Sequence, residues 1–177
     1  MTDPGGRKAR QRAEWDGRTP QRLFDALKAQ PVIGDALCAH GAVLMDEVDH
    51  RTRELVALRV SAVRECAYVW SGHVLIAQKL ALTPGEIQRV AIGPMAYTGR
   101  DAAVLWAADH VLARRPIDPV TERVLGEADV LSICVSTMFY DTVASIMRNA
   151  DPEPGPEPVE GLATPAQARG AYAAMLA

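Results

Sequence analysis

Apolar residues recur three or four positions apart along most of this chain, and polar residues fill the positions between them. Side chains at this spacing share one face of a helix, so the pattern is typical of amphipathic helices. It predicts long helices over about 20–30, 32–45, 50–64, 66–80, 101–114 and 129–149. The chain is therefore expected to be all-α, a single-domain helical bundle of about six or seven helices.

Capping residues and prolines mark where these helices begin and end. Thr83 and Glu86 have the spacing of a capping box, which predicts a further short helix from Pro84 to about residue 91. Pro31 and Pro116 should end the helices before them, because proline disfavours helical geometry in the preceding residue. These signals divide the chain into helices joined by short turns.

The two ends of the chain differ in composition from its centre. Residues 1–18 are rich in glycine and basic side chains and are expected to form a flexible tail. Residues 19–150 hold the predicted helices and form the expected domain. Residues 151–177 begin with a run of proline and glutamate, and Thr164 then caps a short terminal helix.

The predicted helix 129–149 is apolar on most of its faces. A helix of this kind is buried on several sides. We expect it to lie at the centre of the domain or against another subunit.

Composition and charge narrow the classes of protein to which this chain can belong. Hydrophobic residues make up 49% of the chain and aromatic residues only 5%, so an aliphatic core is expected. Lys and Arg number 19 against 22 Asp and Glu, a formal net charge of -3. This balance gives no general attraction to nucleic acid or to anionic membranes, and neither is expected as a partner.

The cysteines and the apolar runs suggest where the protein works. The chain has 3 cysteines, an odd number at wide spacing, which argues against a disulfide framework. Its N-terminus lacks the apolar run of a secretory signal. Charged residues also interrupt the longest apolar stretches before the ~18 residues that a membrane span needs. We therefore expect a cytoplasmic protein.

Reactive side chains gather in one stretch, residues 54–73. It contains the carboxylate of Glu54, the thiol of Cys66, the imidazole of His73 and the polar-tipped aromatics Tyr68 and Trp70. Cys66 falls near a predicted helix N-terminus, where the helix dipole favours a thiolate. Taken alone, the cysteine, the histidine and the two aromatics are more often packing residues, whereas Glu54 is about as often a carboxylate favoured by the helix dipole as a functional group. The chain offers no motif with metal-ligand spacing, so no metal is expected.

The spacing of Glu54, Cys66 and His73 resembles that of the carboxymuconolactone decarboxylase and alkylhydroperoxidase D superfamily. The similarity extends weakly from about Val32 to Asn149. In the peroxidase-like branch the motif is a Glu, a C-x-x-C pair and a His, which together form a thiol redox centre with a proton relay. Glu54 and His73 match the relay and Cys66 the first cysteine, but Val69 replaces the second. A dithiol cycle needs two neighbouring sulfurs, so this departure removes one partner.

The decarboxylase-like branch often carries Tyr-x-Trp-x-x-His, and the run from Tyr68 to His73 resembles it. The resemblance implies a cofactor-independent enzyme with acid/base chemistry of the lyase or isomerase type. Its substrate would be a small organic molecule with a carbonyl or carboxylate group. The substrate-binding candidates are Tyr68, Val69, Trp70 and Ser71.

The resemblance also suggests a role for each candidate. His73 would be the general base or acid, and Glu54 would orient it. Tyr68 or Ser71 would donate a hydrogen bond to a developing oxyanion, and Cys66 would be a polar wall or a secondary proton donor. Trp70 and Val69 would shape the pocket. Arg59 could neutralise a substrate carboxylate or lie at the surface.

Two other functions stay open. The first is a thiol peroxidase or reductase that uses Cys66 alone, with an external thiol resolving its sulfenic acid. The second is a non-catalytic protein that binds a small ligand or forms a structural oligomer, which the loss of a reactive residue at Val69 favours. In every case the resemblance implies a homo-oligomer, either a trimer or a hexamer.

Overall fold

The structure, a computed structural model, describes residues 20–80, 82–150 and 164–167. The predicted tail 1–18 and most of the predicted tail 151–177 lie outside the described residues. Within the described ranges the chain is helical and forms no strand, which confirms the all-α expectation. The helices are α2 (Pro20–Leu27), α3 (Pro31–Glu47), α4 (His50–Arg64), α5 (Ala67–Lys79), α6 (Pro84–Ile92), η1 (Pro94–Ala96), α7 (Gly99–Leu112), α8 (Pro119–Leu125) and α9 (Glu127–Ala150).

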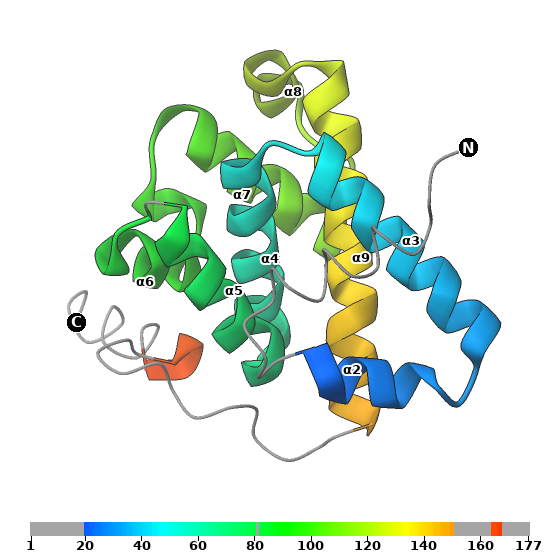
Figure 1. The fold of residues 1–177 in the computed structure, drawn as a ribbon. Coiled ribbons are helices and arrows are strands. Elements are labelled where there is room, and N and C mark those ends of the chain that lie inside the picture. The colour runs from blue at the N-terminus through cyan, green and yellow to red at the C-terminus, as the bar shows by residue number, and fades with distance from the viewer. Residues whose placement is uncertain (1–19, 81, 151–163, 168–177) are drawn as a thin grey trace.

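Helix α4 forms the centre of the domain, where it packs against α5, α6, α7 and α9 (Figure 1). Its aliphatic side chains, among them Leu55, Val56 and Leu58, are fully buried. Residues 52–58 are all buried, the charged Arg53 and Glu54 among them, so α4 needs neighbours on several sides. Most residues of α4 are therefore held by the surrounding helices, whereas His50 and Val63 are exposed.

Helix α9 runs beside α4 along the length of the domain, with α2 near its C-terminal end (Figure 1). Ile133, Tyr140 and Met147 lie on its buried face, whereas Leu131 is exposed. By length and composition α9 would pass for a membrane span, but core helices pass the same test. In this structure α9 packs against α4 and α7 within the domain, as expected for a central helix.

The connection between α4 and α5 sets how these two helices face each other. Glu65 adopts a left-handed conformation with φ of 54°, which ends α4. The backbone N–H of Cys66 then donates to the carbonyl of Ser61 at 2.9 Å, and α5 starts at the next residue. This tight turn brings the two helices back against each other.

The capping box predicted at Thr83 and Glu86 is present. The side chain of Thr83 accepts from the backbone N–H of Glu86, and the side chain of Glu86 accepts from the backbone N–H of Thr83. Thr164 and Gln167 likewise cap each other, and residues 165–167 are helical. The predicted helix 101–114 instead spans Gly99–Leu112. It ends earlier than predicted because Arg114 turns into the left-handed region with φ of 58°, before Pro116 is reached.

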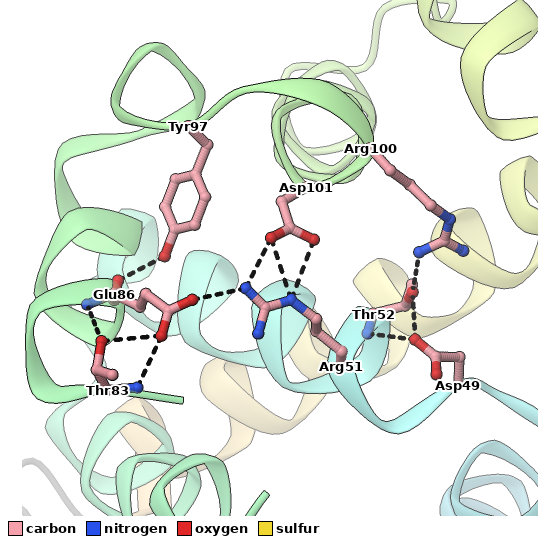
Figure 2. Close-up of polar contacts among 8 residues, drawn as sticks. All are labelled: Asp49, Arg51, Thr52, Thr83, Glu86, Tyr97, Arg100 and Asp101. Carbon is pink, nitrogen blue, oxygen red and sulfur yellow. Dashed lines mark hydrogen bonds and ion pairs between the residues drawn. The ribbon is translucent and has the colours of Figure 1, made fainter. Parts of the chain in front are cut away.

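A cluster of charged side chains ties α4, α6 and α7 together (Figure 2). Arg51 donates to Asp101 at 2.7 Å and to Glu86 at 2.8 Å, so one guanidinium links both helices to α4. The hydroxyl of Tyr97 donates to the carbonyl of Glu86 at 2.5 Å. Hydrogen bonds from Arg51, and then from Thr83, lower the pKa of Glu86 to about 2. This cluster stabilises the packing of three helix N-terminal regions.

Candidate active site

The imidazole of His73 and the carboxylate of Glu54 meet inside the domain. His73 lies on α5 and Glu54 on α4, and the distance from Nδ1 to Oε2 is 2.7 Å. His73 is 3% exposed and Glu54 is 0% exposed. Because a carboxylate can only accept, the contact places a proton on Nδ1, and Nε2 is the ring nitrogen that does not face the carboxylate. That arrangement orients a histidine for proton transfer at Nε2.

Arg53 binds the other oxygen of Glu54. Its Nε donates to Oε1 at 3.1 Å and its Nη1 to the carbonyl of Met45 at 3.0 Å. Burial acts to raise the pKa of Glu54, but the nearby His73 and Arg53 outweigh it, so this pKa lies below its usual range. Glu54 is therefore a charged carboxylate in the interior, with a partner on each oxygen.

His73 lines a cavity of about 100 Å³. A cavity of about 150 Å³ lined by apolar groups holds benzene, so this volume suits a molecule of a few heavy atoms. Aliphatic and aromatic side chains from α2, α3, α5 and α9 form most of the wall. The lining residues are Leu23, Phe24, Leu27, Leu37, Cys38, Gly41, Met45, Tyr68, Val69, Gly72, His73, Phe139, Tyr140 and Val143.

The cavity brings together only some of the predicted binding residues. Tyr68 and Val69 line it, whereas Trp70 and Ser71 are buried but do not line it. The hydroxyl of Tyr68 accepts a hydrogen bond from the backbone N–H of Leu23 at 3.3 Å, which ties α2 to α5. Trp70 and Ser71 precede His73 on α5 but face other parts of the core.

Cys66 is buried at the start of α5 and does not line the cavity. Burial raises the pKa of its thiol, and the backbone N–H groups of Val69 and Tyr68 offset this only in part. The expectation that the helix N-terminus favours a thiolate here is therefore wrong, because the cost of burying the charge is larger. The cysteine that does line the cavity is Cys38, on α3.

Tyr140 and Phe139 are site residues that the sequence analysis missed. The ring of Tyr140 meets the ring of His73 edge-on, with centroids 4.9 Å apart and planes at 85°. Phe139 contacts Tyr140 in the same way, at 5.2 Å and 78°. A polar-tipped aromatic in the otherwise apolar stretch 129–149 was the available signal, but periodicity alone does not say which helix it faces.

Arg59 serves the packing of the domain. It forms two hydrogen bonds with Asp109, at 2.7 and 2.8 Å. It also donates to the carbonyls of Val90 and Ala91 at 3.1 Å each. A role in neutralising a substrate carboxylate is therefore wrong for Arg59, because α6 and α7 already occupy its guanidinium.

Among the described residues, no group of three or more His, Cys, Asp or Glu side chains is placed to hold a metal ion. The site is thus described by its dyad, Glu54 and His73, and by the cavity that His73 faces.

The dyad lies in the segment of the chain that resembles a known family. No curated protein and no solved structure matches the chain. Residues 31–112 match the sequence model of the Carboxymuconolactone decarboxylase family. The matched segment runs from the start of α3 to the end of α7 and contains both Glu54 and His73. Residues 31–112, slightly less than half of the chain, are therefore similar to the carboxymuconolactone decarboxylase family.

Proposed function

We propose that the protein is a cofactor-independent, carboxymuconolactone decarboxylase-like enzyme that transfers a proton to or from a small organic molecule. The observation that carries this proposal is the buried 2.7 Å contact between His73 and Glu54 beside the cavity. A paired histidine and carboxylate at the wall of a small, mostly apolar pocket is an arrangement typical of general acid/base catalysis.

Each side chain of the site has a defined part in this reaction. Glu54 holds Nδ1–H of His73, so Nε2 accepts a proton from the substrate. The imidazolium that forms is then stabilised by the carboxylate 2.7 Å away. Arg53 holds the other carboxylate oxygen at 3.1 Å and keeps Glu54 charged. General base catalysis of this kind contributes roughly 10²- to 10⁴-fold in rate.

The proposed reaction is of the lyase or isomerase type, on a carbonyl or carboxylate compound. Such reactions begin with the removal of a proton, or with the loss of carbon dioxide, next to a carbonyl group. The cavity volume and its mostly apolar wall favour a small substrate. We further propose that the enzyme works in the cytoplasm, as a homo-oligomer.

The burial of Cys66 weakens the alternative of a single-cysteine peroxidase. A peroxidatic thiol must be accessible and readily deprotonated. Cys66 is buried and has a raised pKa. We therefore favour proton transfer by His73 over thiol chemistry at Cys66.

The test is deuterium exchange at the carbon next to the carbonyl of small ketones. Acetone, butanone and cyclopentanone are incubated with the protein in D₂O, and loss of the α-proton signal is followed by NMR. We expect exchange above the buffer rate, and at least about a hundredfold less enzymatic exchange in His73→Gln. His50→Gln, an exposed histidine at the start of α4, is the matched control and should exchange like the wild type.

No exchange of any ketone by the folded wild type would refute the proposal. Full exchange by a folded His73→Gln variant would refute it as well, because the base would then lie elsewhere.

A further inference from the structure

We propose that the cavity binds a small uncharged molecule through one acceptor oxygen, and that the hydroxyl of Tyr140 donates the hydrogen bond to that oxygen. This inference rests on the proposed function, because it concerns the same cavity and the same histidine. It adds a substrate-contacting residue and a chemical class of substrate.

The first observation is the state of the Tyr140 hydroxyl. Tyr140 is 4% exposed and lines the cavity. Among the described residues, none forms a hydrogen bond with its hydroxyl, whereas the hydroxyl of Tyr68 in the same wall accepts from Leu23. The hydroxyl oxygen is not among the fully buried polar atoms that lack a partner, so it is reached from the cavity and is open to a hydrogen bond there. An acceptor atom of a bound molecule would supply the partner.

The second observation is that the ring of Tyr140 has a fixed position. His73 packs edge-on against it at 4.9 Å, and Phe139 does so at 5.2 Å. Such edge-to-face contacts favour one ring orientation. A donor held in place before the ligand arrives loses little freedom on binding. His73 and Tyr140 line the same cavity, so a molecule bound there is within the space that both side chains border.

The third observation concerns charge. Burial raises the pKa of Tyr140 above its usual range, and the negative charge of Glu54 raises it further. The hydroxyl therefore keeps its proton at neutral pH and acts as a donor. The same carboxylate, together with the apolar wall, disfavours a second negative charge in the cavity. A neutral carbonyl compound can accept the hydrogen bond from Tyr140 without bringing a second negative charge into the cavity. A carboxylate can accept the bond but brings that charge.

The test compares three probes of the same ring size: cyclopentanone, methylenecyclopentane and cyclopentanecarboxylate. Their affinities for the wild type, Tyr140→Phe and Tyr97→Phe are measured by NMR titration at pH 7. In the wild type we expect the ketone to bind about 3- to 10-fold more tightly than the alkene, the value of one neutral hydrogen bond. The carboxylate should bind at least about tenfold more weakly than the ketone.

Tyr140→Phe should lose the preference for the ketone and keep the affinity for the alkene, which shows that the cavity is intact. Tyr97→Phe also removes one tyrosine hydroxyl, but this hydroxyl binds the carbonyl of Glu86 in the cluster at the α4, α6 and α7 helix starts. It should bind all three probes like the wild type.

An unchanged ketone preference in Tyr140→Phe would overturn the inference. So would a carboxylate that binds as tightly as the ketone, or no binding of the ketone at all. The proposed function fails separately: a ketone that binds through Tyr140 but shows no deuterium exchange contradicts proton transfer and leaves the binding inference standing.

Discussion

Replacement of Glu54 by glutamine should destabilise the fold through its effect on Arg53. The substitution keeps the size and shape of the side chain and removes its negative charge. Arg53 is 1% exposed, and Glu54 is the carboxylate that it contacts. In the variant, Arg53 would keep its hydrogen bond to the carbonyl of Met45 but would lose its counter-charge.

The expected loss follows from the burial of this pair. Removal of one partner from a buried ion pair costs about 3–5 kcal/mol, because a charge stays in the interior without compensation. For a chain of this length each kcal/mol lowers Tm by about 2–4 °C, so Tm should fall by about 6–20 °C. Glu47→Gln, an exposed glutamate at the end of α3, is the matched control and should stay within about 0.5 kcal/mol.

The assay is urea denaturation followed by circular dichroism, for Glu54→Gln, Arg53→Met and the double variant. If the two charges compensate each other, the double variant should be more stable than the sum of the single losses predicts. The pKa of Glu54 is lower in the folded state than its usual 4.5. The charge of Glu54 therefore contributes its full stabilisation above pH 4.5, and this contribution is lost as the pH falls below that value. The free energy of unfolding of Glu54→Gln should lack this fall below pH 4.5.

A loss below about 1 kcal/mol in Glu54→Gln would refute this reasoning, since a buried unpaired guanidinium must cost more. Strict additivity in the double variant would refute it too, because the two residues would then act independently.

Three further results are expected. Iodoacetamide should modify Cys38 faster than Cys66 in the folded protein, because Cys66 is buried and the pKa of its thiol is raised. Mass spectrometry measures both rates, and faster modification of Cys66 would contradict this prediction. Glu86→Gln should lower the free energy of unfolding by about 1 kcal/mol at pH 7. This loss should vanish as the pH falls from 4.5 towards 2, since the folded-state pKa of Glu86 is about 2. A loss of stability that persists at pH 2 would contradict the pairing of Glu86 with Arg51. Gly41→Ala should weaken ketone binding, because its Cβ would lie 2.9 Å from Cζ of Phe139 and push that ring into the cavity, and Gly41→Ala/Phe139→Leu should restore binding.

The fold could be predicted largely from local signals. Periodicity and caps located the helices because both depend on residues within a few positions of each other. The capping box at Thr83 marked the start of α6, whereas α2 ends at Leu27, before the predicted end near residue 30, and α3 begins at Pro31, one residue before its predicted start. The end of α7 was misplaced because the left-handed turn at Arg114 has no strong local signal in a residue other than glycine or asparagine.

The site could be predicted only in part. The motif spacing singled out Glu54 and His73, and the packing of α4 against α5 brings them together. Tyr140 could not be placed, because which face of α9 meets the cavity depends on contacts between distant segments. The reactivity of Cys66 was misjudged for a similar reason: its place at a helix start can be read locally, but its burial cannot.

The wall of the cavity has a consequence for homologues that share the pair of His73 and Glu54. The matched segment 31–112 carries Glu54 and His73, but α2 before it and α9 after it supply six of the 14 residues that line the cavity. Two homologues with an identical histidine and glutamate could therefore accept different molecules. Exchange of these two flanking helices between homologues would redirect selectivity while the chemistry stays the same.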